Sequence, residues 1–589
     1  MKRGLRFDME LHALTGKPSI DKPWLKYYPS QLLDHLRVPE CTLTQYLQFN
    51  APDADQAAMH YYGTDITWKE VFTEADRLAK ALRAVGFGEG DQIPAFLRSV
   101  PEFIPLLLAA EKIGASILVR DNEIHENADA LRKSGARTMF AHTFLSQTEM
   151  EEYIRTTNVR RFVLIDPVGR CGREQMPHYV QKSLDANFAE PVAHGEHVMS
   201  WCEFQALGDA YEGPVAAPVD IDRPLFRCYT SGSTGPSKQV IHSAHSMIGV
   251  LSQMNFYGEA SFRPTWLVTI LPPCLVAVVI SMLLLPLASR KLLILDPWVD
   301  VMDLDLELIR YRPNNWPMIP MFIEMIIRSP RIPADYDLSH LMAAGAGAEA
   351  YNNTQMARAQ KFFHDHNCMI PFTTGYGSSE AGSNVAFHVA PEYPQGNGNV
   401  GCPMPLTTVG IFKPGTTQEV GYNVEGEICV SGPGVMLGYD DPEATARALK
   451  VHEDGKLWLH MGDIGMMNED GVLYTRGRGT NKRFGGGFLD ILPMENRLAD
   501  AHIDGIEDEF FVNIPDAEHE GYFEPYLYVV LRDGVTVEDV REKVSEALEP
   551  HMVPTRIVQL PERPFWHFKT NRIGLTNEVL RSRACCGVN

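Results

Sequence analysis

Helical and strand patterns alternate repeatedly in the first third of the chain, and this alternation narrows the possible folds more than any other feature. Residues 64–96 read as an amphipathic helix, a glycine-rich turn and a strand. Residues 102–119 repeat the pattern, and residues 128–148 and 162–166 continue it. Because strands joined by helices pair in parallel, the sequence predicts an α/β fold built on a parallel sheet.

The length and the later part of the chain predict further units. The chain has 589 residues, 45% of them hydrophobic, which is too long for a single core. Residues 185–225 read as a long connection rich in loops. Between about residue 398 and residue 476 strands are short and turns are frequent, which indicates a β-rich subdomain. After Arg478 helices and strands alternate again, as in a small α/β domain.

One uncharged stretch, residues 264–289, is long enough to cross a membrane by length alone. Pro272, Pro273 and Pro286 interrupt it, and no other stretch resembles it. This pattern favours a buried strand, a Pro-Pro turn and a buried helix over a membrane span. The N-terminus also lacks the apolar core of a signal peptide, so we expect no membrane span.

Charge and cysteine content limit the partners and the compartment. With 53 basic and 75 acidic residues the formal net charge is −22, which makes the protein a poor partner for nucleic acid. The ten cysteines are scattered and form no C-x-x-C pair, so a zinc site has little support. Dispersed thiols fit a reducing compartment, and we expect a cytoplasmic protein.

The segment 229-YTSGSTGPSKQV-240 combines small hydroxyl side chains, glycines and one lysine, as a loop that wraps a phosphate requires. It is not a Walker loop, because Gln239 follows Lys238 where that loop needs a serine or threonine for magnesium. The segment therefore gives no specific support to the hypothesis of a P-loop enzyme that hydrolyses nucleotides. The candidate phosphate-binding residues are Thr230, Ser231, Gly232, Ser233, Thr234, Gly235 and Lys238.

Further motifs follow this loop along the chain. They are 343-AAGAGAEA-350, 374-TGYGSSEAG-382, 425-EGEICVSGPGVMLGYDDPEAT-445, 461-MGDIG-465 with 470-DGVLYTRGR-478, and 560-LPERPFWHFKTNRIG-574. Together and in this order they resemble the motifs of the adenylate-forming (ANL) superfamily, which includes acyl-CoA synthetases, the adenylation domains of peptide synthetases and luciferases. The resemblance runs from about residue 40 to about residue 580.

The resemblance implies how the chain holds ATP. Tyr376 would stack on the adenine, with Gly377 beside it in the motif, and Ser379 would contact a phosphate. Asp463 would accept hydrogen bonds from the ribose hydroxyls, and Arg478 would hold ribose and phosphate oxygens. The phosphate loop would cradle the remaining phosphates.

The resemblance also assigns the groups nearest the reacting atoms. Lys569 would reach onto the substrate carboxylate and the α-phosphate, and Glu380 would bind Mg²⁺ through its carboxylate. Gly345 and Gly347 would let the backbone pass close to the adenine and the acyl pocket. Gly487 would lie beside a tunnel for the thiol substrate.

The implied architecture is a large N-terminal AMP-binding domain, residues 1–478, with two α/β sheet subdomains and the β-rich subdomain. A hinge at residues 479–483 would connect this body to a small mobile α/β lid, residues 484–589. The family activates a carboxylic acid with ATP to acyl-AMP and pyrophosphate, then transfers the acyl group to a thiol. The implied ligands are ATP, Mg²⁺, coenzyme A and a small carboxylic acid, bound by a monomer or homodimer.

The acid and the acceptor are less defined. Residues 271–289 contain no acidic residue to pair with an ammonium group, which favours an aliphatic or aryl acid over an amino acid. No carrier-protein segment follows the lid, which favours coenzyme A over a separate carrier protein as the acceptor. Asn481, Phe484 and Phe568 depart from the family's lid motifs. A degenerate relative that binds adenylates without turnover is therefore the alternative.

Overall fold

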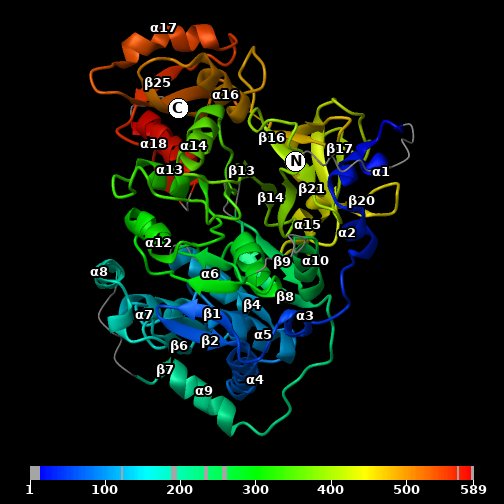
Figure 1. Ribbon diagram of the computed structural model, residues 1–589, viewed down its shortest axis with the longest axis vertical. Coiled ribbons are helices and arrows are strands. Elements are labelled where there is room, and N and C mark those ends of the chain that lie inside the picture. The colour runs from blue at the N-terminus through cyan, green and yellow to red at the C-terminus, as the bar shows by residue number, and fades with distance from the viewer. Residues whose placement is uncertain are drawn as a thin grey trace.

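The computed structural model describes residues 14–120, 124–187, 195–230, 237–254, 262–479, 481–566 and 569–585. Figure 1 shows α/β layers in the blue to green part of the chain, a sheet-rich region in yellow beside them, and a smaller orange and red unit at one end. The α/β class predicted from the sequence is confirmed.

One sheet has the strand order β10–β11–β1–β2. Its strands are β1 (Ala57–Tyr61), β2 (Thr64–Thr67), β10 (Thr265–Val268) and β11 (Leu292–Leu295). Parallel pairing joins β11 to both β1 and β10, and parallel bridges continue from Trp266 through Asn315 to Ala343. A further bridge joins Met318 to Ala346 of β12 (Gly345–Ala346), which pairs with β13 (Thr373–Thr374). The glycine-rich motifs therefore follow the carboxyl ends of these strands, where parallel sheets bind ligands.

The second sheet has the order β19–β9–β8–β4–β3, and a parallel bridge from Ala95 to Phe140 joins it to β5–β6–β7. Its strands are β3 (Gln92–Pro94), β4 (Ser116–Leu118), β5 (Thr138–His142), β6 (Arg161–Ile165), β7 (Val198–Ser200), β8 (Pro224–Tyr229), β9 (Gln239–Ser243) and β19 (Gly438–Tyr439). β8 and β9 pair antiparallel, and the connection between them is the predicted phosphate loop.

Amphipathic helices connect and cover these strands. α4 (Trp68–Ala84) begins with a capping box formed by Thr67 and Glu70, and it buries its apolar stripe. The other helices of the body are α3 (Leu43–Asn50), α5 (Phe103–Ile113), α6 (Ile124–Ser134), α7 (Gln147–Thr156), α8 (His178–Asn187), α10 (Ala244–Met254), α12 (Leu304–Tyr311), α13 (Pro320–Arg328), α14 (Asn353–Asp365) and α15 (Pro442–Ala448).

The connection predicted to be rich in loops contains a helix, α9 (Trp201–Ala210). It packs so closely on α4 that a Cβ at Gly208 would lie 2.2 Å from the carbonyl oxygen of Arg77. A glycine inside a short helix weakens the helical signal, so the prediction missed an element that tertiary packing stabilises. The capping box of Ser200 and Glu203 is the signal that marks its start.

The uncharged stretch 264–289 forms a strand, a turn and a buried helical segment, as predicted. The helical segment consists of the π-helix η3 (Val278–Leu284) and α11 (Leu285–Ala288). Pro286 has no N–H to donate to the preceding turn, which favours the wider π geometry there. In the described part of the chain, no helix is long and apolar enough to cross a membrane.

A mainly antiparallel sheet follows the order β14–β15–β16–β22–β21–β18–β17, with β20 on β21. Its strands are β14 (Tyr376–Ser378), β15 (Ser383–Phe387), β16 (Asn399–Pro403), β17 (Thr408–Phe412), β18 (Gly426–Ser431), β20 (Leu449–Val451), β21 (Leu457–Met467) and β22 (Leu473–Gly477). Two of these strands precede residue 398, so the sheet starts earlier than the predicted subdomain.

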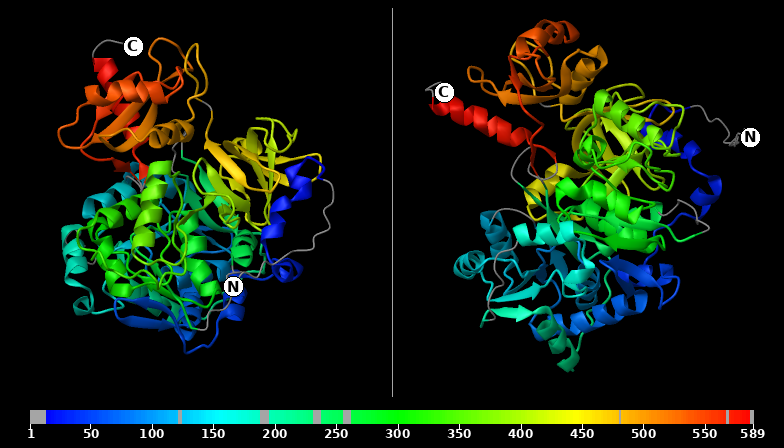
Figure 2. Two further views of the ribbon diagram at one scale, coloured as in Figure 1. Left: turned by 45° about the horizontal axis from the view of Figure 1, so that its top comes forward. Right: turned by 60° about the vertical axis from the view of Figure 1, so that its left-hand side comes forward.

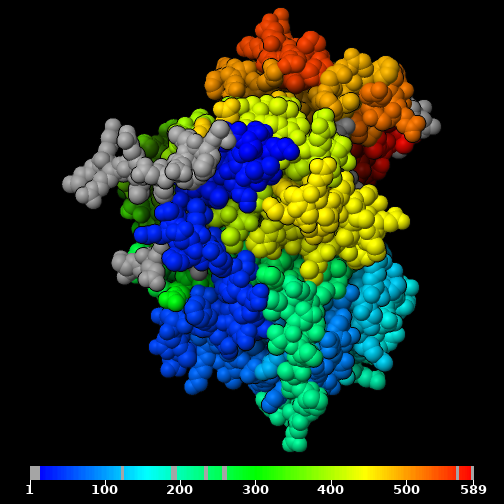
Figure 3. All heavy atoms as spheres, turned by 90° about the vertical axis from the view of Figure 1, so that its right-hand side faces the viewer, coloured from blue at the N-terminus to red at the C-terminus, as the bar shows by residue number. Residues whose placement is uncertain are grey.

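The N-terminal segment lies against this sheet, as Figure 3 shows for the blue and yellow parts of the surface. It carries α1 (Pro18–Asp21), η1 (Pro23–Tyr27) and α2 (Ser30–His35). Ser19 Oγ donates to Glu419 at 2.7 Å, and Tyr422 Oη donates to Asp21 at 2.8 Å. These bonds join residues about four hundred positions apart, so they are tertiary contacts that local pattern does not specify.

The C-terminal unit has a sheet and a core of its own. β23 (Ile506–Pro515), β24 (Phe523–Leu531) and β25 (Arg556–Gln559) pair in that order, with α16 (Ile491–Ala501), α17 (Val537–Ala547) and α18 (Arg572–Cys585) around them. Figure 2 shows this unit at one end of the molecule in both views. A hairpin of β26 (Phe565–Trp566) and β27 (Lys569–Thr570) extends from it toward the body. The hinge at 479–483 remains a prediction.

Candidate active site

A cavity of about 1320 Å³ opens beside the carboxyl ends of β8, β12 and β13. Six of the residues predicted from the motifs line it: Thr230, Gly345, Gly347, Gly377, Ser379 and Lys569. They come from four separate parts of the chain, and Lys569 enters from the C-terminal unit. The structure therefore brings the phosphate loop's end, the glycine-rich turn, the YGSSE motif and the lid lysine to one site.

Tyr376 and Asp463 meet at the nucleotide end of the site. Tyr376 Oη donates to Asp463 Oδ2 at 2.7 Å, and Arg478 Nε lies 3.4 Å from Asp463 Oδ1. Burial raises the pKa of Asp463, while the hydrogen bond from Tyr376 and the charge of Arg478 oppose that rise. Gly462 has φ +72°, and the pairing of β21 with β22 shifts register between Ile464 and Gly465. The resulting group combines an aromatic ring, a hydrogen-bond acceptor and a cation.

Glu380 follows the same motif and has a phenolic partner. Its Oε1 accepts from Tyr439 Oη at 2.8 Å, and the ammonium of Lys238 lies 5.1 Å from the Tyr439 ring centroid. No described residue donates to the other carboxylate oxygen, which leaves a hard oxygen ligand of the kind that Mg²⁺ prefers. The donor chemistry of Glu380 therefore fits a magnesium ion, and the sequence did not identify Tyr439 as its partner.

A buried histidine holds the YGSSE motif in place. His242 Nε2 lies 2.8 Å from the carbonyl oxygen of Ser379, and Nδ1 lies 3.1 Å from Ser246 Oγ. Burial lowers the pKa of His242 to about 4, so the ring is neutral at pH 7. A neutral ring can donate from Nε2 and accept at Nδ1, which satisfies both contacts.

The phosphate loop is described only at its two ends, because Ser231, Gly232, Ser233, Thr234 and Gly235 lie outside the described residues. At its base, the backbone N–H of Thr230 donates to the carbonyl of Lys238 at 2.9 Å. Ser237 Oγ donates back to the Thr230 carbonyl at 2.6 Å. These bonds close the β8–β9 connection next to the cavity.

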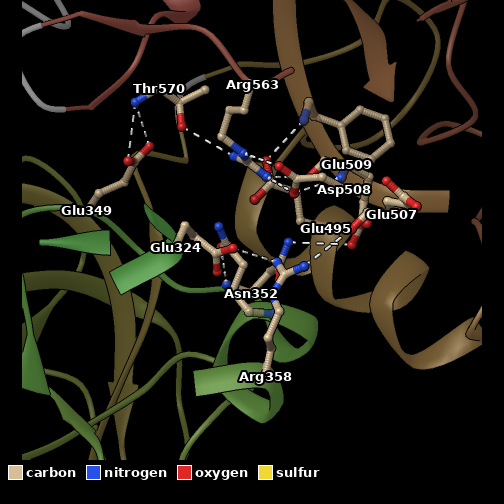
Figure 4. Close-up of polar contacts among 12 residues, drawn as sticks. Glu324, Glu349, Asn352, Arg358, Glu495, Glu507, Asp508, Glu509, Arg563 and Thr570 are labelled. Carbon is tan, nitrogen blue, oxygen red and sulfur yellow. Dashed lines mark hydrogen bonds and ion pairs between the residues drawn. The ribbon is translucent and has the colours of Figure 1, made fainter. Parts of the chain in front are cut away.

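Lys569 is the first residue of β27 in the C-terminal hairpin, and it is half-buried in the cavity wall. Burial lowers its pKa, and the carboxylates of Glu349 and Glu380 counteract this effect. The neighbouring Thr570 donates its backbone N–H to Glu349, at 3.3 and 3.2 Å from the two carboxylate oxygens. Figure 4 shows Glu349 pointing at Thr570 across the boundary between body and lid.

Arg572 continues this contact into the lid. Its Nη1 donates to Glu349 at 2.8 Å and its Nη2 donates to Glu495 at 2.9 Å. Glu495 also accepts the backbone N–H of Phe511 at 2.9 Å. Glu349 lies in the glycine/alanine-rich motif, but no local pattern connects it to a residue more than two hundred positions away, so sequence reasoning missed it.

A second polar cluster adjoins the first (Figure 4). Arg563 pairs with Asp508 at 2.6 Å, and both side chains are buried. Arg563 Nη1 also donates to Thr570 Oγ1 at 3.2 Å. Burial and the nearby Asp508 raise the pKa of Glu509 to about 8, and Asn352 of the body donates to Glu509 at 3.5 Å. Buried charges thus hold the hairpin that carries Lys569.

The predicted thiol-tunnel residue lies elsewhere. Gly487 is not among the residues lining the cavity, and a Cβ there would lie 2.8 Å from His551 Nε2 within the lid. Phe484 stacks on His519 with 3.6 Å between ring centroids. Phe568 lies outside the described residues. The role of Gly487 remains a prediction.

Comparison with known proteins identifies the family to which the chain is similar. A family model described as AMP-binding enzyme matches residues 48–440. A long-chain-fatty-acid–CoA ligase of Bacillus subtilis is 25% identical over 564 residues, covering 90% of this chain and 93% of that protein. 4-Coumarate–CoA ligase 3 of Oryza sativa is 28% identical over 429 residues, covering 70% and 69%.

Solved structures share the fold. ATP-bound MatB from Rhodopseudomonas palustris has a TM-score of 0.74 at 19% identity, covering 92% of this chain and 99% of that one. A benzoate CoA ligase from Burkholderia xenovorans has a TM-score of 0.71 at 19% identity, covering 91% and 100%. The likeness spans the body and the lid together, which agrees with the extent of the motif resemblance.

Proposed function

The chain belongs to the family of AMP-binding enzymes, and on this premise we propose that it is an AMP-forming acyl-CoA synthetase. It activates a carboxylic acid with ATP, releases pyrophosphate and passes the acyl group to coenzyme A. The observation that carries the proposal is the position of Lys569, which lines the cavity where the charges of Glu349, Glu380 and Arg478 act on it. The CoA ligases among its relatives support the choice of acceptor.

In the first step a carboxylate oxygen attacks the α-phosphorus of ATP, and the bond from that phosphorus to pyrophosphate breaks. A carboxylate is a weak nucleophile and the triphosphate is highly anionic, so the site must align the reactants and supply positive charge. Lys569 donates to the carboxylate and to the α-phosphate oxygens. Asp463 accepts from the ribose hydroxyls, and the Tyr376 ring stacks on the adenine. Glu380 would hold Mg²⁺, which would supply further positive charge to the phosphates when bound.

In the second step the coenzyme A thiolate attacks the acyl carbon, and the bond from that carbon to AMP breaks. In this proposal Lys569, which lines the cavity, leaves it when the thiol enters. Rotation of the lid about residues 479–483 exchanges this hairpin for another lid surface, on which Gly487 lies. The contacts of Glu349 with Thr570 and Arg572 break in that rotation.

The wall of the acyl pocket supports an acid without an amino group. Leu271, Cys274, Leu275, Val276 and Met282 line it, and none carries a charge. We propose a cytoplasmic enzyme that acts as a monomer or homodimer. The cysteines at the described positions 41, 171, 202, 228, 274, 368, 402 and 429 are free thiols, which supports a reducing compartment.

Pyrophosphate exchange into ATP, measured over a panel of carboxylic acids, tests the first step. We expect exchange that depends on one class of acid, and formation of its CoA thioester when coenzyme A is added. Reactions without acid serve as the control. Binding of ATP without exchange for any acid would identify a non-catalytic adenylate-binding relative instead. Exchange without thioester formation would point to a separate carrier protein.

A further inference from the structure

The cavity extends well beyond the nucleotide, and a lysine lies at its far end. Lys291, Trp266 and Asn315 all line it. Lys291 directly precedes β11, and Asn315 pairs with Trp266 and with Ala343. These positions lie at the amino ends of the parallel strands, whereas the catalytic motifs follow the carboxyl ends.

The bridges give the span between the two ends. Asn315 pairs with Ala343, and Met318 pairs with Ala346 three residues further along both segments. Three residues of a strand span about 10 Å. Gly347, which lines the nucleotide end, follows Ala346 directly. A ligand that reaches from the reacting carboxylate to Lys291 therefore spans about 10 Å or more.

The far end of the cavity is basic. Arg263, Arg290 and Lys291 line it, and the described lining contains no carboxylate there. The one described acidic residue of the lining, Glu126, pairs with Arg120 at 2.7 Å. Arg120 lies 3.9 Å from the ring centroid of Tyr229, next to the phosphate loop, so that pair belongs to the opposite end.

Of these three side chains, the Lys291 ammonium donates no hydrogen bond to a described residue. Arg263 donates to the backbone carbonyls of residues 290 and 291, both at 3.2 Å, and Arg290 Nε donates to the Asn50 carbonyl at 3.1 Å. Within the described part of the chain, the one interaction of Lys291 Nζ is with the Trp266 ring, 4.7 Å from its centroid. Burial lowers the pKa of Lys291 to about 8, so most of it is protonated at pH 7. A partly buried ammonium without a counterion is unfavourable unless a ligand supplies one.

We propose that Lys291 binds a second carboxylate at the distal end of the acid, so that the enzyme activates one end of an α,ω-dicarboxylic acid. The inference rests on the proposed synthetase function and names its substrate class. The neutral wall at 271–289 contacts the apolar spacer, and the ammonium just beyond this wall pairs with the terminal carboxylate. A spacer of about 10 Å excludes short dicarboxylic acids, because their second carboxylate cannot reach the lysine.

The test compares dicarboxylic and monocarboxylic acids of equal chain length in pyrophosphate exchange. Wild type, Lys291→Met and Lys291→Arg are assayed, with Lys361→Met, an exposed lysine on α14, as the matched control. In Lys291→Met we expect the ratio of kcat/KM for the dicarboxylic acid to that for the monocarboxylic acid to fall about tenfold or more. Lys291→Arg should keep most of the preference because it keeps the charge, and Lys361→Met should equal wild type.

Two results would overturn the inference in distinguishable ways. If wild type activates monocarboxylic acids and the ratio does not respond to Lys291→Met, the distal-carboxylate site is wrong and the synthetase function stands. If no acid supports exchange, both fail. Melting temperature and ATP binding of each variant show whether it is folded. If Lys291→Met fails to fold, wild type and Lys291→Arg still test the site. A wild type that does not prefer the dicarboxylic acid over the monocarboxylic acid refutes the proposal.

Discussion

The two ends of the cavity each hold a half-buried lysine, and the two lysines differ in their partners. Lys569, at the nucleotide end, lies among carboxylates, with Glu349 and Glu380 raising a pKa that burial lowers. At the acyl end, burial lowers the pKa of Lys291, and no charge of a described residue counteracts it. Where the protein supplies the counterions, at Lys569, we propose that the lysine acts on bound ATP. At Lys291, where no described residue supplies one, the proposed substrate provides the counterion.

The two ends also differ in how they are held. Lys569 is carried by a hairpin whose contacts with the body are polar, through Glu349 and Arg572. Lys291 precedes a strand of the body sheet, between buried apolar segments. Polar contacts exchange partners with water at modest net cost, whereas apolar burial does not. This difference supports our proposal that the nucleotide end is the part that opens during a catalytic cycle.

Lys569→Ala should produce the largest effect, because it removes the positive charge nearest the α-phosphate. We expect pyrophosphate exchange to fall by about three orders of magnitude while ATP affinity changes by less than about threefold. Exchange kinetics and calorimetric ATP binding measure the two effects. Lys361→Ala is the control. Unchanged exchange in Lys569→Ala would remove the lysine from the mechanism.

Glu349→Gln should come next, because it leaves the Arg572 guanidinium without one of its two counterions and loosens the hairpin. Loss of one partner from a buried pair costs about 3 kcal/mol, so we expect exchange to fall about a hundredfold. Thioester formation from added acyl-AMP should change much less, because the hairpin leaves the cavity in that step. Glu443→Gln, an exposed carboxylate on α15, is the control. Equal losses in both half-reactions would show that Glu349 only supports folding.

Lid stability should depend on pH through Glu509. Its folded pKa of about 8 lies above the ordinary value of 4.5, so the folded state binds this proton more tightly. The stabilisation is complete below about pH 4.5 and is lost as the pH rises toward 8, at about 1.4 kcal/mol per pH unit. We expect a loss of about 2 kcal/mol between pH 6 and pH 7.5, measured by urea unfolding. Glu509→Gln should flatten this slope, and an unchanged slope would contradict the assignment.

Tyr376→Phe should give the smallest effect. It removes the phenolic donor to Asp463 while keeping the ring that faces the adenine. One hydrogen bond to a charged group is worth about 1.5 kcal/mol, so we expect KM for ATP to rise about tenfold with little change in kcat. Tyr474→Phe, whose hydroxyl has no hydrogen bond among the described contacts, is the control. A large fall in kcat would mean that Tyr376 also acts in the chemical step.

Much of the site followed from the sequence because its motifs are local. The YGSSE, MGDIG and GR segments each present their polar groups within a few residues, and the structure brings Tyr376, Asp463 and Arg478 together. The parallel sheet followed from alternating helical and strand patterns. The sequence prediction missed α9 because Gly208, at its contact with α4, weakens the local helical signal. Packing against α4 stabilises the helix in spite of this glycine.

By itself the sequence determined the α/β class, the adenylate-forming motifs and the lysine that enters from the lid. Only the tertiary structure decided which groups meet across the chain: Glu349 with Thr570 and Arg572, Tyr439 with Glu380, and Lys291 with the far end of the acyl cavity. The physical reason is that motifs report local backbone and side-chain chemistry. Burial and the pairing of charges depend on segments that are distant in sequence and adjacent only after folding.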